Sequence, residues 1–222
     1  MRSVKYECMR MTSHSDGVSG PGLSRMFDGT PCMPTSCTKP ARRRSVRSSG
    51  ESLPRPKGPG DHVYGGGGQP FLNFIIAYEQ IARVNYTAAF LLSSSNSGPI
   101  DSIVQLGSES IKKKYLTKLA TNEWLAAIAI TEPDAGSDMG AIRTRAVVEG
   151  NKVRINGNKI YVGGGGDFEV YVVFVRMSDA PGIDGLGTVV VDVDAPGLKF
   201  GPKFRMLGSR PVPRSEIIFD NC

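Results

Sequence analysis

The sequence predicts an α+β protein in which a helical segment precedes an antiparallel β-barrel or β-sandwich domain. Between residues 71 and 123, apolar residues recur at the three- and four-residue intervals of helices. After Trp124 they form short stretches bounded by turn residues, and no helical pattern separates those stretches, which is typical of antiparallel all-β domains. We therefore expect a basic Ser/Arg/Pro/Gly-rich segment at 1–62, a helical part at 63–124 and a β domain at 125–222.

The composition is that of an ordinary soluble protein. Of the 222 residues, 40% are hydrophobic and 22% are charged, and no apolar run approaches the ~20 residues of a membrane-spanning helix. We therefore expect a soluble protein of the cytoplasm or the mitochondrial matrix. The net charge of +6 is concentrated in the first sixty residues, and no basic helix face follows. This distribution argues against a nucleic-acid partner.

The first segment, residues 1–62, lacks both the helical and the strand periodicity. Its low content of periodic apolar residues predicts disorder. Its Arg and Ser content also resembles a mitochondrial targeting signal, against which stand Glu7, Asp16 and Asp28. Cys32 and Cys37 lie here without a second pair at metal-ligand spacing, so we expect no metal site.

The next segment predicts helices. The stretch "FLNFIIAYEQIARVNYTAAFLL" (71–92) has helical spacing, and a second pattern runs from Pro99 to Leu106. Gly107 is placed to end it, and Ser108 is placed to cap a following helix that lays Ile111, Tyr115 and Leu119 along one face.

Strands are predicted from residue 125 onward. The first, "LAAIAIT" (125–131), ends at Glu132-Pro133, where proline favours extended geometry in the residue before it. Gly150-Asn151 and Gly157-Asn158 predict tight turns between strands. The remaining strands are expected near residues 142–149, 152–156, 159–162, 169–176, 187–194, 198–200 and 215–220.

The loop "ITEPDAGSD" (130–138) joins the two parts and allows three interpretations. Glu132 and Asp138 could form an acid–base pair, although nothing in the sequence makes them face one substrate. The loop could be only a turn. Alternatively, its hydroxyls and the backbone N–H groups of its small residues could hold a polar, planar or anionic ligand.

This loop closely resembles the Thr-Glu-Pro-x-Ala-Gly-Ser-Asp signature of the acyl-CoA dehydrogenase family. Similar segments flank it in the family's order: "YGGGG" and "EQIARVNYTAA" upstream, and "VRINGNKIYV", a hairpin of the Ile-Asn-Gly-x-Lys type, downstream. The later strands up to "SEIIFDN" resemble the family as well, so the resemblance covers about residues 63–221.

The resemblance implies a partial N-terminal helical domain followed by the family's middle β domain. It also implies FAD, and α,β-dehydrogenation of an acyl-CoA thioester with the flavin as hydride acceptor. Carried over by position, Ile130 and Thr131 would line the flavin ring, and Gly136 and Ser137 would lie near the cofactor, with Ser137 also near the acyl-CoA. The segment Tyr161-Val162-Gly163 would lie against the flavin, with Tyr161 where many members carry tryptophan. Glu132 and Asp138 then belong to loop architecture.

Two departures from the family pattern affect these expectations. Gly163 stands where the family usually carries a Thr or Ser hydroxyl for the flavin, and no carboxylate up to Cys222 matches the family's catalytic base, so we predict no catalytic residue in this chain. We expect this chain to be incomplete and to lack most of the interface of the homo-oligomeric family. An electron-transferring flavoprotein is one candidate electron acceptor. The alternatives are a non-catalytic remnant or binding protein, and a sibling acyl-CoA oxidase or flavin monooxygenase.

Overall fold

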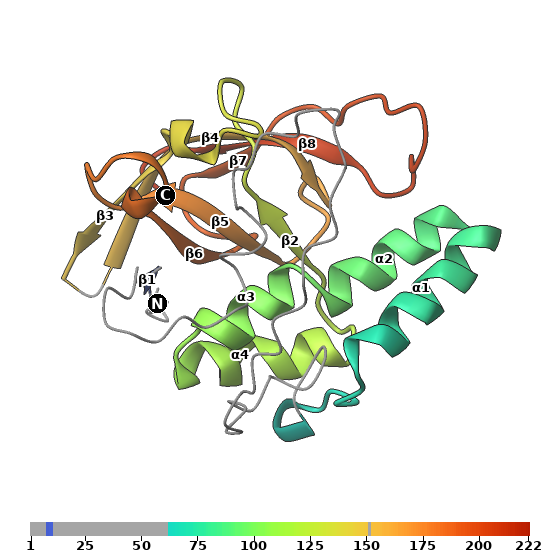
Figure 1. Cartoon of the computed structure of the whole chain (residues 1–222). Coiled ribbons are helices and arrows are strands. Elements are labelled where there is room, and N and C mark those ends of the chain that lie inside the picture. The colour runs from blue at the N-terminus through green and yellow to red at the C-terminus, as the bar shows by residue number, and fades with distance from the viewer. Residues whose placement is uncertain (1–7, 11–61, 151) are drawn as a thin grey trace, which may run out of the picture. The chain divides into compact units, whose positions relative to one another are not determined.

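A series of consecutive helices makes up the first part of the fold (Figure 1). The computed structural model describes residues 8–10, 62–150 and 152–222. In these residues the 3₁₀ helix η1 (His62–Tyr64) is followed by α1 (Phe71–Val84), α2 (Tyr86–Asn96), α3 (Pro99–Leu106) and α4 (Glu109–Ala120). The predicted helical spacing over 71–92 therefore corresponds to two helices.

Polar caps and a glycine set the boundaries of these helices. Asn85 ends α1 and caps α2, because its side chain accepts a hydrogen bond from the Ala88 N–H at 3.1 Å. The predicted Ser108 cap is confirmed, with its hydroxyl accepting from the Ile111 N–H at 3.4 Å. At Gly107 a Cβ would lie 2.5 Å from the Ile103 carbonyl oxygen, so the close approach that ends α3 requires glycine.

Helices α3 and α4 pack against the sheet through a shared apolar cluster. The predicted face of α4 is confirmed, since Ile111, Tyr115 and Leu119 are all buried, together with Leu116. These side chains join Ile100 and Ile103 of α3 and buried residues of three strands: Ala126, Val170, Val172 and Val190. Burial of these apolar side chains fixes the two helices to one face of the sheet.

The second part is a curled sheet of eight strands in the described residues (Figure 1). Its strands are β1 (Cys8–Arg10), β2 (Ala126–Ala129), β3 (Arg145–Glu149), β4 (Lys152–Gly163), β5 (Val170–Arg176), β6 (Leu186–Asp192), β7 (Leu198–Phe200) and β8 (Arg214–Phe219), with the 3₁₀ helices η2 (Met139–Ala141) and η3 (Gly182–Gly185) between them. The order is β1-β6-β5-β3-β4-β8-β7, with β2 paired to β5.

The predicted α+β architecture is confirmed, and the sheet is mixed where the sequence predicted only antiparallel pairs. Strand β2 runs parallel to β5, and β3 is joined to β5 by a single parallel pair. All other pairs are antiparallel. Parallel neighbours require a long crossover connection, and here the β3–β4 hairpin lies within the connection between β2 and β5.

The predicted turn at Gly157-Asn158 is wrong, because β4 runs through it as one strand. The first half of β4 pairs with β3, and from Gly157 onward it pairs with β8. Gly157 has φ +139°, and a Cβ there would lie 2.6 Å from Thr144 Oγ1. Glycine is therefore required for close backbone approach where the strand changes partner. The predicted turn after β3 begins at Gly150, and Asn151 lies outside the described residues.

A β-bulge near the end of β4 changes which side chains face inward. Val153, Ile155 and Lys159 are buried, two or four residues apart, as the strand period requires. The register with β8 then shifts between Lys159 and Val162, and Tyr161 adopts φ 57°. Because of the extra residue, Tyr161 points outward and Val162 points inward.

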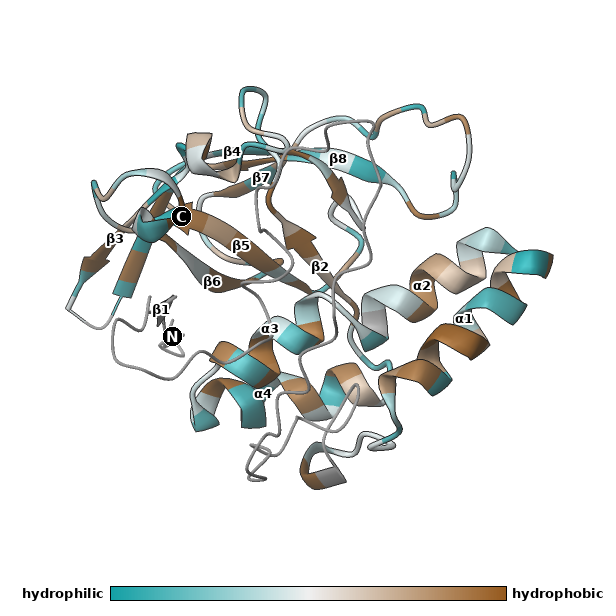
Figure 2. Ribbon diagram, viewed as in Figure 1, coloured by the Kyte–Doolittle hydropathy of each residue, from teal (hydrophilic) through white to brown (hydrophobic). Residues whose placement is uncertain are grey.

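The main core lies inside the curl of the sheet. Strand β5 is buried from Val170 to Val175 and β6 from Leu186 to Val191, so both strands are covered on both faces. Figure 2 shows the apolar residues concentrated along β5 and β6 and also along α1. In α1, however, no residue is buried.

Most of the predicted disordered segment at 1–62 lies outside the described residues, as do Cys32 and Cys37. Within it, residues 8–10 form β1, which pairs with β6. No helix in the described ranges has both the length and the apolar composition needed to cross a membrane. The same residues contain no cluster of three or more His, Cys, Asp or Glu side chains arranged for a metal ion.

Candidate functional site

A cavity of about 330 Å³ lies between the helices and the sheet. Its helical side comes from α2 and the start of α3, and its sheet side comes from β2, the residues just after it and the end of β4. The lining residues are Phe90, Ser93, Ser94, Ser97, Gly98, Pro99, Ala126, Ala127, Ile128, Ile130, Thr131, Ile160, Tyr161, Val162, Gly163, Phe168 and Arg214. The volume is at the lower end of the roughly 300–1,000 Å³ of small-molecule sites.

Five of the seven predicted site residues line this cavity. Two segments far apart in the sequence meet there, Ile130-Thr131 and Tyr161-Val162-Gly163. Gly136 and Ser137 do not line the cavity, and both are exposed on the loop that follows. The structure therefore brings together the two strand-end segments and leaves the tip of the loop apart from them.

Sequence reasoning missed the helical wall and one charged residue. The wall consists of Phe90 and the serines of α2, whose spacing gave no signal beyond helix formation. Arg214, at the start of β8, is the one charged side chain among the described lining residues. Its guanidinium lies 4.9 Å from the Phe90 ring centroid, and its Nη1 donates to the Tyr161 carbonyl at 3.3 Å.

Thr131 offers hydrogen-bonding groups that the described residues do not use. Its carbonyl accepts from the Ile160 N–H at 2.8 Å. No described residue pairs with its own N–H or with its hydroxyl. Because Thr131 is only half-buried, these two groups are available to a polar ligand atom.

The serines on the helical wall have their protons engaged within the helix. Ser94 Oγ donates to the Phe90 carbonyl at 3.1 Å, and Ser97 Oγ donates to the Ser93 carbonyl at 2.9 Å. Ser93 Oγ lies 3.0 Å from Ser97 Oγ and is therefore the donor in that contact. Toward the cavity these hydroxyls present acceptor oxygens.

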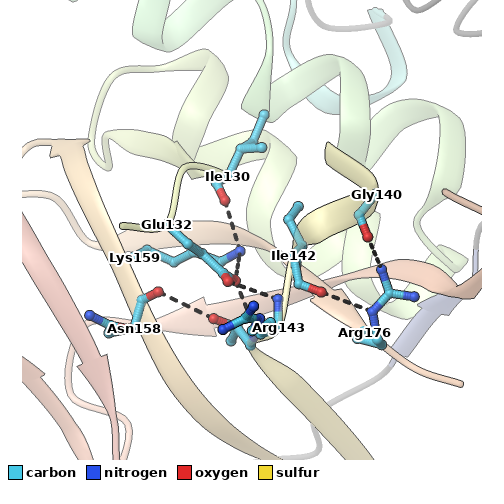
Figure 3. Close-up of polar contacts among 9 residues, drawn as sticks. Ile130, Glu132, Gly140, Ile142, Arg143, Asn158, Lys159 and Arg176 are labelled. Atoms are coloured by element: carbon cyan, nitrogen blue, oxygen red, sulfur yellow. Dashed lines mark hydrogen bonds and ion pairs between the residues drawn. The ribbon is translucent and has the colours of Figure 1, made fainter. Parts of the chain in front are cut away.

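A buried ion pair lies beneath the loop at the sheet side of the cavity (Figure 3). Lys159 Nζ donates to Glu132 Oε1 and to the Ile130 carbonyl, both at 2.8 Å. The two side chains are 0% and 7% exposed. The Glu132 carboxylate also accepts from the N–H groups of Arg143 at 2.8 Å and Thr144 at 2.9 Å.

The ionisation of this pair follows from burial and hydrogen bonding. Burial lowers the pKa of Lys159 to about 8, against the opposing effect of the Glu132 carboxylate. Burial would raise the pKa of Glu132, but hydrogen bonds from Lys159 and from Thr144 and Arg143 together hold it below its usual value. Both groups are therefore charged at pH 7.

A second, half-buried cation holds the far end of the same loop (Figure 3). Arg176 Nε donates to the Ile142 carbonyl at 2.8 Å, and its Nη2 donates to the Gly140 carbonyl at 2.7 Å. Its remaining donors reach the carbonyls of Ala180 and Gly182. The loop is thus tied to the sheet at both ends, while Gly136 and Ser137 stay exposed between them.

The interpretation of Glu132 as loop architecture is supported by these contacts. Its two oxygens accept from Lys159 and from two backbone N–H groups, so the carboxylate is fully engaged. Asp138 is exposed, and neither carboxylate lines the cavity. The pair does not have the geometry of two groups facing one substrate.

Comparison with protein-family models identifies two adjacent matches. Residues 60–123 match the model described as "Acyl-CoA dehydrogenase, N-terminal domain", and residues 127–222 match "Acyl-CoA dehydrogenase, middle domain". The two matches meet at the junction between α4 and β2.

Individual relatives agree with these matches over part of their length. An acyl-CoA dehydrogenase of Bacillus subtilis is 35% identical over 159 residues, which is 72% of this chain and 42% of the relative. The structure of butyryl-CoA dehydrogenase from Megasphaera elsdenii superimposes with TM-score 0.69 at 30% identity over 72% of this chain and 43% of that one.

A further structure, of a glutaryl-CoA dehydrogenase from Mycobacterium smegmatis in complex with FADH2, gives TM-score 0.65 at 28% identity, over 71% of this chain and 40% of that one. The chain thus spans about two fifths of the length of the relatives that it matches.

Proposed function

The chain belongs to the acyl-CoA dehydrogenase family, as the matches to its N-terminal and middle domains show, and on that basis we propose that the cavity holds the flavin of FAD. The proposal rests on Thr131, which lines the cavity. Its hydroxyl and its N–H have no hydrogen-bond partner among the described residues. A flavin ring carries acceptor atoms along one edge and broad apolar faces, and it needs such donors beside an apolar wall.

The lining fits a planar ring with a polar edge. Ile130 and Val162 provide apolar contact and exclude water, and Phe90 and Tyr161 supply aromatic surface. Tyr161 also has the left-handed backbone conformation, an uncommon geometry for a non-glycine residue that clusters at functional sites. Arg214 adds a positive charge, which favours an electron-rich ligand.

In the proposed reaction, α,β-dehydrogenation of an acyl-CoA thioester, FAD would supply hydride acceptance. The residues of this chain would bind and orient the ring: Thr131 by donating to its polar edge, and Gly163 through its backbone in place of a side-chain hydroxyl. Gly136 and Ser137 stay predicted to contact the cofactor and the acyl-CoA from the exposed loop. An electron-transferring flavoprotein stays one candidate electron acceptor.

One observation favours the second candidate, a flavin-binding protein without dehydrogenase activity. No carboxylate is among the described residues that line the cavity, so we assign no proton acceptor to them. Dehydrogenation of a thioester requires a base for the α proton. Binding of FAD without bleaching by acyl-CoA would identify this candidate.

The proposal is tested by FAD affinity in the full chain and in two matched variants. Thr131→Val removes the hydroxyl at nearly constant volume, and Thr117→Val makes the same change on the exposed face of α4. We expect FAD to bind the parent chain and Thr117→Val equally. Thr131→Val should bind about fivefold more weakly, since a hydrogen bond contributes about 1 kcal/mol. Equal affinity in all three proteins would contradict the role of Thr131.

A further inference from the structure

Lys159 is a fully buried cation that does not line the cavity. Its side chain is 0% exposed, and its ammonium has two acceptors among the described residues, Glu132 Oε1 and the Ile130 carbonyl. Burying an ammonium group is costly, and an apolar side chain of similar volume is often as stable or more so. Neutral residues at both 132 and 159 would remove the buried charges, but they would still leave the Ile130 carbonyl without its Lys159 donor.

That hydrogen bond determines the direction of the Thr131 N–H. The peptide bond between Ile130 and Thr131 is trans, since no described peptide bond is cis. In a trans peptide the carbonyl oxygen and the following N–H point in opposite directions. Because Lys159 holds the Ile130 oxygen, the Thr131 N–H points away from Lys159, while Ile130 and Thr131 both line the cavity.

The neighbouring groups hold the rest of the segment. The Ile160 N–H donates to the Thr131 carbonyl at 2.8 Å, and the N–H groups of Arg143 and Thr144 hold the Glu132 carboxylate. The Ile130 carbonyl is therefore bound by the Lys159 side chain (Figure 3), and the Thr131 carbonyl is bound by the backbone of the next residue of β4, Ile160. Of these two donors, only the Lys159 side chain can be removed without placing a proline in the strand.

We propose that Lys159 is a positioning residue for the flavin: by holding the Ile130 carbonyl it directs the Thr131 N–H toward the ligand in the cavity. This inference rests on the proposed function. Lys159 touches neither the cavity nor the ligand, and it acts through the backbone of Ile130-Thr131. Glu132 keeps the lysine charged and fixed in place.

The test separates positioning from stability by removing both buried charges together. Lys159→Met alone leaves the Glu132 carboxylate buried without its partner and can prevent folding. The double variant Glu132→Gln/Lys159→Met removes both charges and also the donor to Ile130. Lys199→Met is the matched control, because Lys199 makes an exposed ion pair with Asp220 at 2.7 Å.

We expect the double variant to keep a thermal midpoint within a few degrees of the parent and to bind FAD at least tenfold more weakly. Lys199→Met should match the parent in both measurements. An unchanged dissociation constant for FAD in the folded double variant would overturn the proposal, since the segment would then be positioned without Lys159.

Amide hydrogen exchange distinguishes failure of this inference from failure of the proposed function. If the parent chain binds no FAD, the proposed function fails, and the Ile160 amide then reports on the segment directly. Exchange of this amide at least tenfold faster in the double variant, with the Val172 amide of β5 unchanged, supports the role of Lys159 in holding the segment. Unchanged exchange at Ile160 contradicts that role.

Discussion

The two walls of the cavity differ in how they are held. On the sheet side, Ala126 and Val162 are buried, and the adjoining loop is tied down by Lys159 and Arg176. On the helical side, α2 is backed by α1, a helix of 14 residues in which none is buried. Leu72 and Val84 of α1 are 65% and 91% exposed.

This difference shows that apolar composition does not decide burial. Helix α4, with three consecutive lysines, buries four side chains because they join the apolar cluster formed with α3 and strands β2, β5 and β6, whereas the more apolar α1 contacts mainly α2. A helix with no buried side chain has little tertiary stabilisation. We therefore expect the sheet side of the cavity, the sheet wall, to be stable. We expect its helical side, the helical wall, to unfold locally with little cost in free energy, and the following changes test this contrast.

The largest effect is expected from breaking the ion pair under the sheet wall. Glu132→Ala leaves the Lys159 ammonium buried without its carboxylate and frees two backbone N–H groups. We expect a loss of about 3–5 kcal/mol in the free energy of unfolding, measured by denaturant titration. Asp134→Ala removes an exposed ion pair with Arg143 and should cost less than about 0.5 kcal/mol. If the two variants lose the same unfolding free energy, the buried ion pair contributes no more to stability than the exposed one.

Acid should weaken the same wall. The folded-state pKa of Glu132 lies below its usual value, so its contribution to stability is fully present above the unfolded-state pKa and is lost as pH falls through the folded-state pKa. Relative to Glu132→Gln/Lys159→Met, the parent chain should lose unfolding free energy as the pH falls below 4.5, the ordinary pKa of a glutamate. If the unfolding free energies of the two proteins change with pH in the same way, then contacts in the folded state do not lower the pKa of Glu132.

A smaller effect is expected from the core behind the sheet wall. Ile217 of β8 is 0% exposed and belongs to the cluster that contains Val162. Ile217→Val removes one methylene group and should cost about 0.5–1.5 kcal/mol. The value is measured by the same denaturant titration, and no change would indicate a loosely packed core.

The smallest effect is expected in the helical wall. Leu72→Ala removes a mostly exposed side chain and slightly favours helix formation, so the unfolding free energy should change by no more than about 0.5 kcal/mol. Hydrogen exchange of α1 amides should be faster than that of β5 amides. A loss above about 2 kcal/mol on Leu72→Ala would show that α1 is covered in solution, since such losses come from core side chains.

Local signals in the sequence were sufficient for several parts of the structure. The Ser108 cap and the buried face of α4 depend on neighbouring residues and were predicted correctly. The segments 130–131 and 161–163 were placed together only by the family resemblance, because no local pattern links the end of β2 to the end of β4.

Other parts depend on contacts that the sequence does not display. Gly157-Asn158 is a sequence typical of a turn, but glycine is required at 157 because the backbone there lies close to Thr144. The parallel pairing of β2 with β5 depends on the path of the whole chain between them. Lys159 lies at an inward position of the strand period, which was the one available sign that it would be buried.

Binding of a flavin in this cavity is best tested by measuring the amount of FAD bound per chain. The purified full chain is saturated with FAD, free cofactor is removed, and the flavin released on denaturation is identified and quantified. We expect near-stoichiometric FAD in the parent chain, less FAD in Thr131→Val and an unchanged amount in Thr117→Val. Absence of bound flavin at saturating FAD would contradict the proposed binding.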